Sequence, residues 1–465
     1  SYVKWEMHPP FHYYFLHFWF VLFGATETAA HLSSVFLSVG AVVALYFLGK
    51  ELFNSRLAGL AAAALYSFSP LFCFFGVWAR MYTMLFFVAT LSFLFFLKFI
   101  KVRGRKSFYL GAFFIFFTLA ALFTHLTAGL IVGIEVVYLI YLCLTKQEKL
   151  KEIFFKFLAP FLIIIAAYGP WFWYFWHSRF KALGGNAWYF DIHERLSPWV
   201  SLIYDSLKYL TPFDQYFFNL LAFSLLMILG FSAFAALSWS NKAGLKLRGY
   251  FSNGAFFSLL IFLLSFAGLS LANLYVLRYA IIPAIGLFLL LGYGFSRSGR
   301  ALQAAAFSLF LTLSLLSFST MSKTSLYPVD WKGAAHFIEQ NEKSGDKIIG
   351  SMYTNIFSLD FYYHGRLPIS APLDEKYRGD DLLLTAIKTN IYPTTSQDNI
   401  GQMRDFLGNT RRIFFIISNG DGAFPGTERI AADWLAEQGF VKVQEWRGAK
   451  DNIFLVWIME RMNGK

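Results

Sequence analysis

The sequence has very little cysteine and very little charge. Only Cys73 and Cys143 occur among 465 residues, and no Cys/His group has metal-ligand spacing, so neither a disulfide framework nor a zinc motif is expected. Charged residues make up 15% of the chain and hydrophobic residues 57%, with a mean hydropathy of +0.51. This composition excludes the two or three soluble globular domains that a chain of this length would otherwise suggest.

Long apolar stretches account for the hydrophobicity. A helix needs about 20 apolar residues to cross a bilayer, and ten stretches of this kind lie between residues 27 and 320. The sequence therefore predicts a polytopic α-helical membrane protein. The predicted spans are 27–49, 56–73, 80–97, 107–123, 126–144, 157–176, 216–238, 252–272, 275–295 and 301–320.

Lysine and arginine are distributed unevenly between the loops. Alternate loops hold sixteen of these cations, whereas the short loops on the other side carry only Arg80 and Arg278. Because cytoplasmic loops are enriched in Lys and Arg, residues 1–26, 177–215 and 321–465 are predicted to lie outside the plasma (inner) membrane. Since Ser1 lies outside in this topology, at least one earlier crossing is expected, and the simplest total is eleven spans.

The formal net charge of +12 does not indicate a nucleic-acid partner. Residues 321–465 contain 17 Lys/Arg and 18 Asp/Glu, so the membrane half carries the whole excess. The basicity therefore reflects topology and contact with anionic membrane lipid, and no nucleic acid is expected.

The composition changes near residue 321, where Ser, Lys, Thr and Asp replace Phe and Leu. Residues 1–320 are interpreted as the membrane domain and residues 321–465 as a soluble domain. Helices are predicted over 330–343 and 427–438, and strands over 347–351, 411–418, 440–447 and 452–459, with the last two paired antiparallel. This alternation predicts a small extracytoplasmic α/β domain.

Several ionisable residues fall at the predicted outer side. Burying a charge costs several kcal/mol unless a partner offsets it, and an outward cavity with several cations is suited to the phosphate of a lipid. Each residue also has a simpler interpretation. Arg80 and Arg278 lie at span ends, where such side chains extend to lipid headgroups. His125 lies in a tight turn, and Glu135, in the middle of a span, is expected to be structural.

A series of short motifs resembles one family. They are His8-Pro9-Pro10-Phe11-His12-Tyr13-Tyr14, Phe23-Gly24, Leu48-Gly49-Lys50-Glu51-Leu52-Phe53, Ala79-Arg80-Met81-Tyr82, Leu277-Arg278-Tyr279 with Pro283, and Asp330-Trp331-Lys332-Gly333-Ala334-Ala335. In this order they are similar to the GT-C fold glycosyltransferases of the protein O-mannosyltransferase and aminoarabinose transferase type, which carry a short soluble tail in bacteria and archaea.

The resemblance implies a fold, a reaction and a set of contacts. It implies an enzyme that transfers a sugar, with inversion, from a polyprenyl-phosphate donor to a hydroxyl of a protein, lipid or polysaccharide acceptor outside the membrane. His8, Arg80 with Tyr82, and Arg278 with Tyr279 match the family's motifs and are the expected contacts to the donor phosphate or sugar, together with His125 at the outer turn. Whether a divalent cation takes part is left open.

The catalytic aspartate of the family stands in an Asp-Glu pair just after the first span, a position that would lie upstream of Ser1. The resemblance therefore places it in a preceding segment of the natural protein, or else another group is the base. Glu6 is the nearest carboxylate in this sequence and is the candidate base, with metal binding or acceptor positioning as equal alternatives.

Two other functions stay open. One is a non-catalytic glycolipid-binding relative, which an absent catalytic aspartate would favour. The other is a transporter or flippase of lipid-linked sugar. A transporter usually shows two similar halves, and no such repeat is evident in the sequence.

Overall fold

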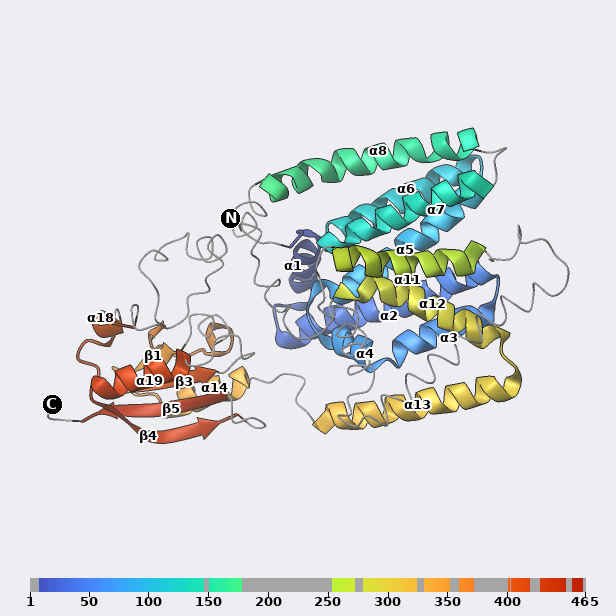
Figure 1. The fold of residues 1–465 in the computed structure, drawn as a ribbon. Coiled ribbons are helices and arrows are strands. Elements are labelled where there is room, and N and C mark those ends of the chain that lie inside the picture. Colours follow the sequence, from blue (N-terminus) through green and yellow to red (C-terminus); the bar gives the residue numbers. More distant parts are fainter. Residues whose placement is uncertain are drawn as a thin grey trace. The chain divides into compact units, whose positions relative to one another are not determined.

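The structure is a computed structural model, and it describes residues 8–145, 150–177, 253–271, 279–323, 330–351, 359–371, 400–401, 403–418, 427–448 and 454–462. The chain divides into two compact units, with the boundary between Met321 and Ser322. The first unit is helical and the second contains a β-sheet (Figure 1). The predicted combination of a helical membrane fold with a C-terminal α/β region is therefore confirmed.

The first unit consists of apolar helices. Their described members are α1 (Phe11–Phe23), α2 (Glu27–Phe53), α3 (Arg56–Ser67), α4 (Pro70–Val77), α5 (Met81–Lys101), α6 (Arg105–Leu122), the 3₁₀ turn η2 (Leu126–Ala128), α7 (Gly129–Thr145), α8 (Leu150–Phe175), α11 (Asn253–Leu271), α12 (Ile281–Arg297) and α13 (Arg300–Lys323).

Helices cover nine of the ten predicted spans, and the predicted span 216–238 lies outside the described residues. Among the described helices, α2, α5, α6, α7 together with η2, and α8 are long and apolar enough to cross a membrane. The predicted span 56–73 is instead two helices, α3 and α4, with a bend of 68° between them. Helix α4 begins at Pro70, which has no backbone N–H with which to continue the preceding helix.

Helix α5 is the centre of the first unit. It contacts α2, α4 and α12 as well as α6 and α7, and most of its side chains are buried. In Figure 1, α6, α7 and α8 lie on one side of α5 and α2 and α3 on the other. Close packing of α12 on α3 depends on Gly292, because a Cβ there would lie 2.6 Å from the carbonyl oxygen of Ala58. Small residues of this kind allow membrane helices to approach closely.

A polar contact joins three of these helices. The hydroxyl of Ser92 in α5 donates to Oε1 of Glu135 in α7 at 3.0 Å and lies 2.8 Å from Oγ1 of Thr118 in α6. Glu135 is completely buried, so the hydroxyl supplies a partner that a buried carboxyl group needs. The other oxygen, Oε2, has no hydrogen-bond partner among the described residues, and the structural role expected for Glu135 stays a prediction.

The second unit is a mixed sheet with helices on both faces. Its elements are α14 (Trp331–Asn341), β1 (Lys347–Gly350), β2 (Ile369–Ser370), α18 (Met403–Leu407), β3 (Arg412–Ser418), α19 (Thr427–Glu437), β4 (Phe440–Arg447) and β5 (Phe454–Arg461). The strand order is β2-β1-β3-β5-β4; β1 is parallel to β2 and β3, and β5 is antiparallel to β3 and β4. The antiparallel pair predicted from sequence is therefore confirmed.

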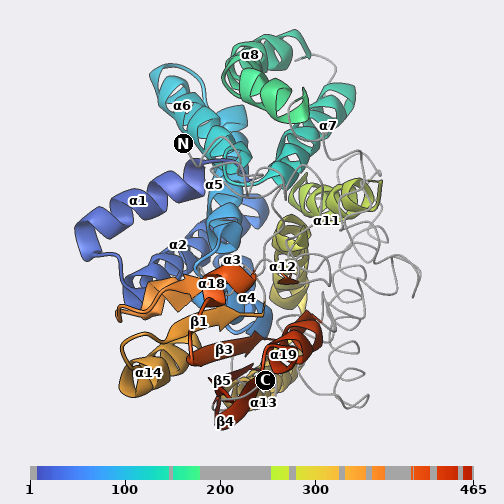
Figure 2. The same ribbon diagram turned by 90° about the vertical axis from the view of Figure 1, so that its left-hand side faces the viewer.

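Alternate residues of β3 form the two cores of the second unit. Phe414 and Ile416 pack with α14, whereas Ile413, Phe415 and Ile417 pack with α18 and α19. This alternation is what a strand buried on both faces requires. Figure 2 shows α14 and α19 on opposite sides of the sheet.

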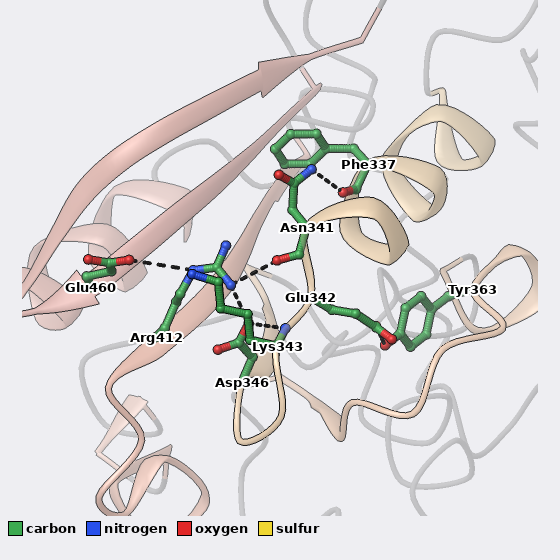
Figure 3. Close-up of polar contacts among 8 residues, drawn as sticks. All are labelled: Phe337, Asn341, Glu342, Lys343, Asp346, Tyr363, Arg412 and Glu460. Carbon is green, nitrogen blue, oxygen red and sulfur yellow. Dashed lines mark hydrogen bonds and ion pairs between the residues drawn. The ribbon is translucent and has the colours of Figure 1, made fainter.

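A buried ion pair connects α14, the following turn and β3 (Figure 3). Nη1 of Arg412 donates to Oδ2 of Asp346 at 2.6 Å and to the carbonyl oxygen of Asn341 at 2.9 Å. The backbone N–H of Lys343 also donates to Oδ2 of Asp346, at 2.9 Å, and Nε of Arg412 lies 3.6 Å from Glu460. Beside this group the hydroxyl of Tyr363 donates to the carboxylate of Glu342.

Candidate functional site

The segment that begins at His8 is fixed against the end of α6. His8, Pro9 and Pro10 precede α1, and the backbone N–H of Phe11 donates to the carbonyl oxygen of Phe123 at 2.9 Å. Helix α1 has 13 residues, a length of about 20 Å, which is too short to cross a bilayer core of about 30 Å. The sequence did not predict this helix, which lies in the segment assigned to the outside.

His125 forms the turn that follows α6. It is the N-cap of η2, where its Nδ1 accepts a hydrogen bond from the backbone N–H of Thr127 at 3.2 Å and lies 2.8 Å from the Thr127 hydroxyl. Because Nδ1 accepts, the neutral ring carries its proton on Nε2. The imidazole is 5% exposed, so the turn fixes both its position and its tautomer.

Three other candidate residues surround His125. The centre of its ring lies 6.1 Å from that of His8, 6.4 Å from that of Tyr82 and 5.5 Å from that of Tyr279. These side chains come from the segment before α1, from α5 and from the segment before α12. We call His8, Tyr82, His125 and Tyr279 the His125 cluster. It brings together imidazole N–H and phenol O–H groups, which donate hydrogen bonds.

Arg80 lies two residues before Tyr82, at the N-cap of α5, and its side chain is exposed. The turn that carries it is held by α2. Nδ1 of His31 binds the carbonyl oxygen of Val77 at 2.6 Å, and the hydroxyl of Ser34 donates to the carbonyl oxygen of Trp78 at 2.7 Å. The backbone N–H of Arg80 donates to the same Trp78 oxygen at 2.6 Å. Helix α2 therefore holds the backbone of the turn from which the Arg80 side chain extends.

His12 belongs to the opening motif of the sequence, but the sequence alone assigned it no role. Its side chain is 3% exposed, and neither ring nitrogen has a hydrogen-bond partner among the described residues. Burial, and then the charges of Arg80 and His8, lower the pKa of His12 to about 4. The imidazole is therefore neutral at physiological pH. Its place in the opening motif, four residues after His8, was the signal in the sequence.

The remaining predictions fall on residues that the structure does not describe. Ser1, Glu6 and Arg278 all lie outside the described residues. The role of Glu6 as the base, the donor contact of Arg278 and the placement of the family's aspartate upstream of Ser1 therefore stay predictions.

A metal site is not formed by the part of the chain that the structure describes. Within that part, no group of three His, Cys, Asp or Glu side chains is placed to hold a metal ion. The described residues alone therefore do not form the divalent-cation site that the sequence left open.

The family comparison matches the part of the chain that contains most of the His125 cluster. Residues 7–174 match the family model described as dolichyl-phosphate-mannose-protein mannosyltransferase. This range includes His8, Tyr82 and His125 but not Tyr279. A search of curated protein sequences finds no match.

Two solved structures are similar. The archaeal oligosaccharyltransferase AglB from Archaeoglobus fulgidus, solved in complex with an inhibitory peptide and a dolichol-phosphate, has a TM-score of 0.53 and 11% identity over 97% of this chain and 66% of its own. The arabinofuranosyltransferase AftD from Mycobacteria has a TM-score of 0.43 and 16% identity over 94% of this chain and 35% of its own. The second score is too low to support an argument.

The fold is that of the GT-C glycosyltransferases. The resemblance stated from the sequence motifs is thereby confirmed at the level of the fold. The apolar helices of the chain indicate a multi-pass membrane protein. At 11% identity the likeness to AglB shows the fold alone, and this chain spans 66% of the length of that one.

Proposed function

We propose that this protein transfers a hexosyl or pentosyl group from a polyprenyl-phosphate donor to a hydroxyl of a protein, lipid or polysaccharide acceptor. The observation that supports this proposal is the convergence of His8, Tyr82, His125 and Tyr279 from separate segments of the chain. The family match over residues 7–174 adds the chemistry of a lipid-phosphate sugar donor. Preorganised donors of this kind stabilise negative charge as it develops on a leaving phosphate.

The proposed reaction is a direct displacement at the anomeric carbon. A carboxylate takes the proton of the acceptor hydroxyl, the oxygen forms a bond to C1 of the sugar, and the bond from C1 to the phosphate oxygen breaks. The electron pair leaves with the lipid phosphate, and the configuration at C1 inverts. Nε2–H of His125 and the phenol groups of Tyr82 and Tyr279 would donate to the phosphate, and Arg80 would balance its charge. Glu6 is the proposed base within this sequence.

The location of the reaction follows from the charge distribution. Arg80 lies at the end of α5 opposite Lys101, and the turn of His125 follows the end of α6 opposite Arg105. Lys101 and Arg105 belong to the sixteen loop cations. Because these cations mark the cytoplasmic side, the site is proposed to open on the extracytoplasmic face of the plasma membrane. The C-terminal α/β unit is proposed to lie on that face as well.

The test is transfer of labelled sugar by the full-length protein in detergent, with a panel of polyprenyl-phosphate hexoses and pentoses. His125→Ala and Arg80→Ala should each lower kcat/KM by about 100-fold or more, which is the usual effect of removing a donor to developing charge. Arg103→Ala is the matched control, because Arg103 lies in the loop at the other end of α5 and is exposed.

Two results would contradict the proposal. Transfer that is unchanged in His125→Ala and Arg80→Ala would remove the cluster from the reaction. A folded wild-type protein that binds the lipid donors but turns none of them over would instead favour a non-catalytic glycolipid-binding protein.

A further inference from the structure

The buried imidazole of His12 makes no hydrogen bond within the part of the chain that the structure describes. Neither Nδ1 nor Nε2 has a hydrogen-bond partner among these residues, although the side chain is only 3% exposed. A polar group that is removed from water and makes no hydrogen bond destabilises the folded state. Groups of this kind require an explanation, and an absent ligand is one.

His12 lies beside the candidate site. Its neighbour Phe11 donates a 2.9 Å hydrogen bond to Phe123, two residues before His125. Arg80 and His8 are close enough for their charges to act on the ring. The two unpaired ring nitrogens of His12 therefore lie at the border of the His125 cluster, near Arg80, the cation proposed to bind the donor phosphate.

The protonation state of His12 selects among ligands. A neutral imidazole has one N–H donor and one nitrogen acceptor. An anionic phosphate oxygen matches the donor but is repelled by the acceptor lone pair, whereas a hydroxyl group both donates and accepts. Within the lipid donor itself, the hydroxyls nearest to a phosphate held by Arg80 belong to the sugar that is bonded to that phosphate.

We propose that His12 binds a ring hydroxyl of the donor sugar and so distinguishes a sugar-bearing lipid phosphate from a sugar-free one. This inference rests on the proposed function, because it takes the donor to be a polyprenyl-phosphate sugar. It assigns to His12 a contact with the sugar, separate from the phosphate contacts of the cluster.

The experiment measures binding of two kinds of probe to the full-length protein in detergent: the polyprenyl-phosphate sugars of the transfer panel, and sugar-free polyprenyl phosphate. His12→Phe should weaken binding of the sugar-bearing lipid about 5- to 10-fold, the value of one or two hydrogen bonds, and change binding of the sugar-free lipid by less than about twofold. His17→Phe is the matched control, since His17 is an exposed residue of the same helix, and should change neither affinity.

Two further readouts separate a ligand contact from a packing role. Without ligand, His12→Phe should melt at the same temperature as the wild type or higher, because it removes unsatisfied buried nitrogens. His12→Asn keeps one donor and one acceptor and should recover part of the lost affinity.

The inference is overturned if His12→Phe weakens both lipids equally or neither of them, or if His12→Asn binds the sugar-bearing lipid no better than His12→Phe. A wild-type protein that binds neither lipid would overturn the proposed function itself and this inference with it. A wild type that transfers sugar, with His12→Phe unaltered in lipid preference, would overturn this inference alone.

Discussion

Replacing Arg412 with methionine should strongly destabilise the C-terminal unit (Figure 3). Methionine keeps an unbranched apolar chain but removes the cation from Asp346, whose side chain is 6% exposed. Of the two hydrogen bonds that Asp346 accepts through Oδ2, the one from Arg412 at 2.6 Å is lost and the one from the Lys343 backbone at 2.9 Å remains. Removing one partner of a buried ion pair costs roughly 3–5 kcal/mol of stability. Because Arg412 is partly exposed, we expect a loss near the lower end of this range, about 3 kcal/mol.

Amide hydrogen exchange of β3 in the full-length protein measures this effect. The backbone amides of Ile413 to Ile417 lie in a strand that is paired on both sides, so the slowest of them exchange when the unit opens. A loss of about 3 kcal/mol should make that exchange about 100-fold faster. Arg447→Met is the matched control, because Arg447 is 60% exposed and pairs with Glu445 at the surface. It should change the rate by no more than about twofold.

A double variant separates the cost of the unpaired carboxylate from the cost of lost packing. If the main cost is the buried Asp346 carboxylate left without a cation, adding Asp346→Asn to Arg412→Met should restore at least half of the lost protection against amide exchange. Exchange that stays as fast in the double variant as in Arg412→Met would show that lost packing dominates. An increase of less than about fivefold in Arg412→Met would refute the argument as a whole.

Three other perturbations have defined outcomes. Burial lowers the pKa of His12 from 6.5 to about 4, so below pH 6.5 the unfolded chain binds a proton that the folded chain does not. The free energy of unfolding should therefore be constant above pH 7 and fall by about 3 kcal/mol toward pH 4. In detergent, the melting temperature of His12→Phe should depend less on pH than that of the wild type. Ser34→Ala removes the 2.7 Å hydrogen bond to the carbonyl oxygen of Trp78. Because this bond helps to hold the turn that carries Arg80, the KM for the lipid donor should rise severalfold while the melting temperature stays nearly unchanged. An unaltered KM would contradict this. Gly333→Ala places a Cβ against the capping carboxylate of Asp330 and 2.8 Å from Trp446. It should lower the free energy of unfolding by about 1–2 kcal/mol, measured by hydrogen exchange of the α14 amides. Unchanged protection of these amides would show that the cap shifts freely.

Hydropathy was sufficient to predict the long membrane helices and insufficient for the shorter features. Helices α2, α5, α6, α7 and α8 follow from apolar runs that are long enough to cross a membrane. The bend between α3 and α4 was missed because an average over about 20 residues does not detect one break. Helix α1 was missed because its 13 residues are fewer than a span requires.

The strands of the C-terminal unit were predicted where the side chains are most apolar. The run that became β3 was assigned to within one residue, at Arg412–Ser418, and β4 was assigned at Phe440–Arg447. The two-residue strand β2 was not predicted, because Ile369–Ser370 joins the sheet only through its parallel pairing with β1. Pairing of so short a strand depends on a neighbour distant in sequence and leaves no local pattern.

The members of the candidate site were predictable one by one, but their grouping was not. Family motifs indicated His8, Arg80, Tyr82 and Tyr279, whereas their arrangement around His125 depends on how helices distant in sequence pack together. His31 and Ser34 were missed for the same reason, since they bind carbonyl groups 46 and 44 residues away. A serine or histidine at the end of an apolar span has no sequence signal that separates such a contact from an exposed position.

These contacts show how the chain can hold its donor groups in place without many ion pairs. His125 is oriented by Thr127, the Arg80 turn by Ser34 and His31, and the start of α1 by the carbonyl of Phe123. Each contact is a hydrogen bond to the backbone or from it, and none of them uses the guanidinium of Arg80, so the charge of that group is left for an anionic ligand. Fixed donors beside such a cation are the arrangement that stabilises a leaving phosphate. Recognition residues are commonly carried by loops, so acceptor choice is expected to depend on loops outside this frame. Substitutions in the frame should change donor affinity and rate without changing which acceptor is used.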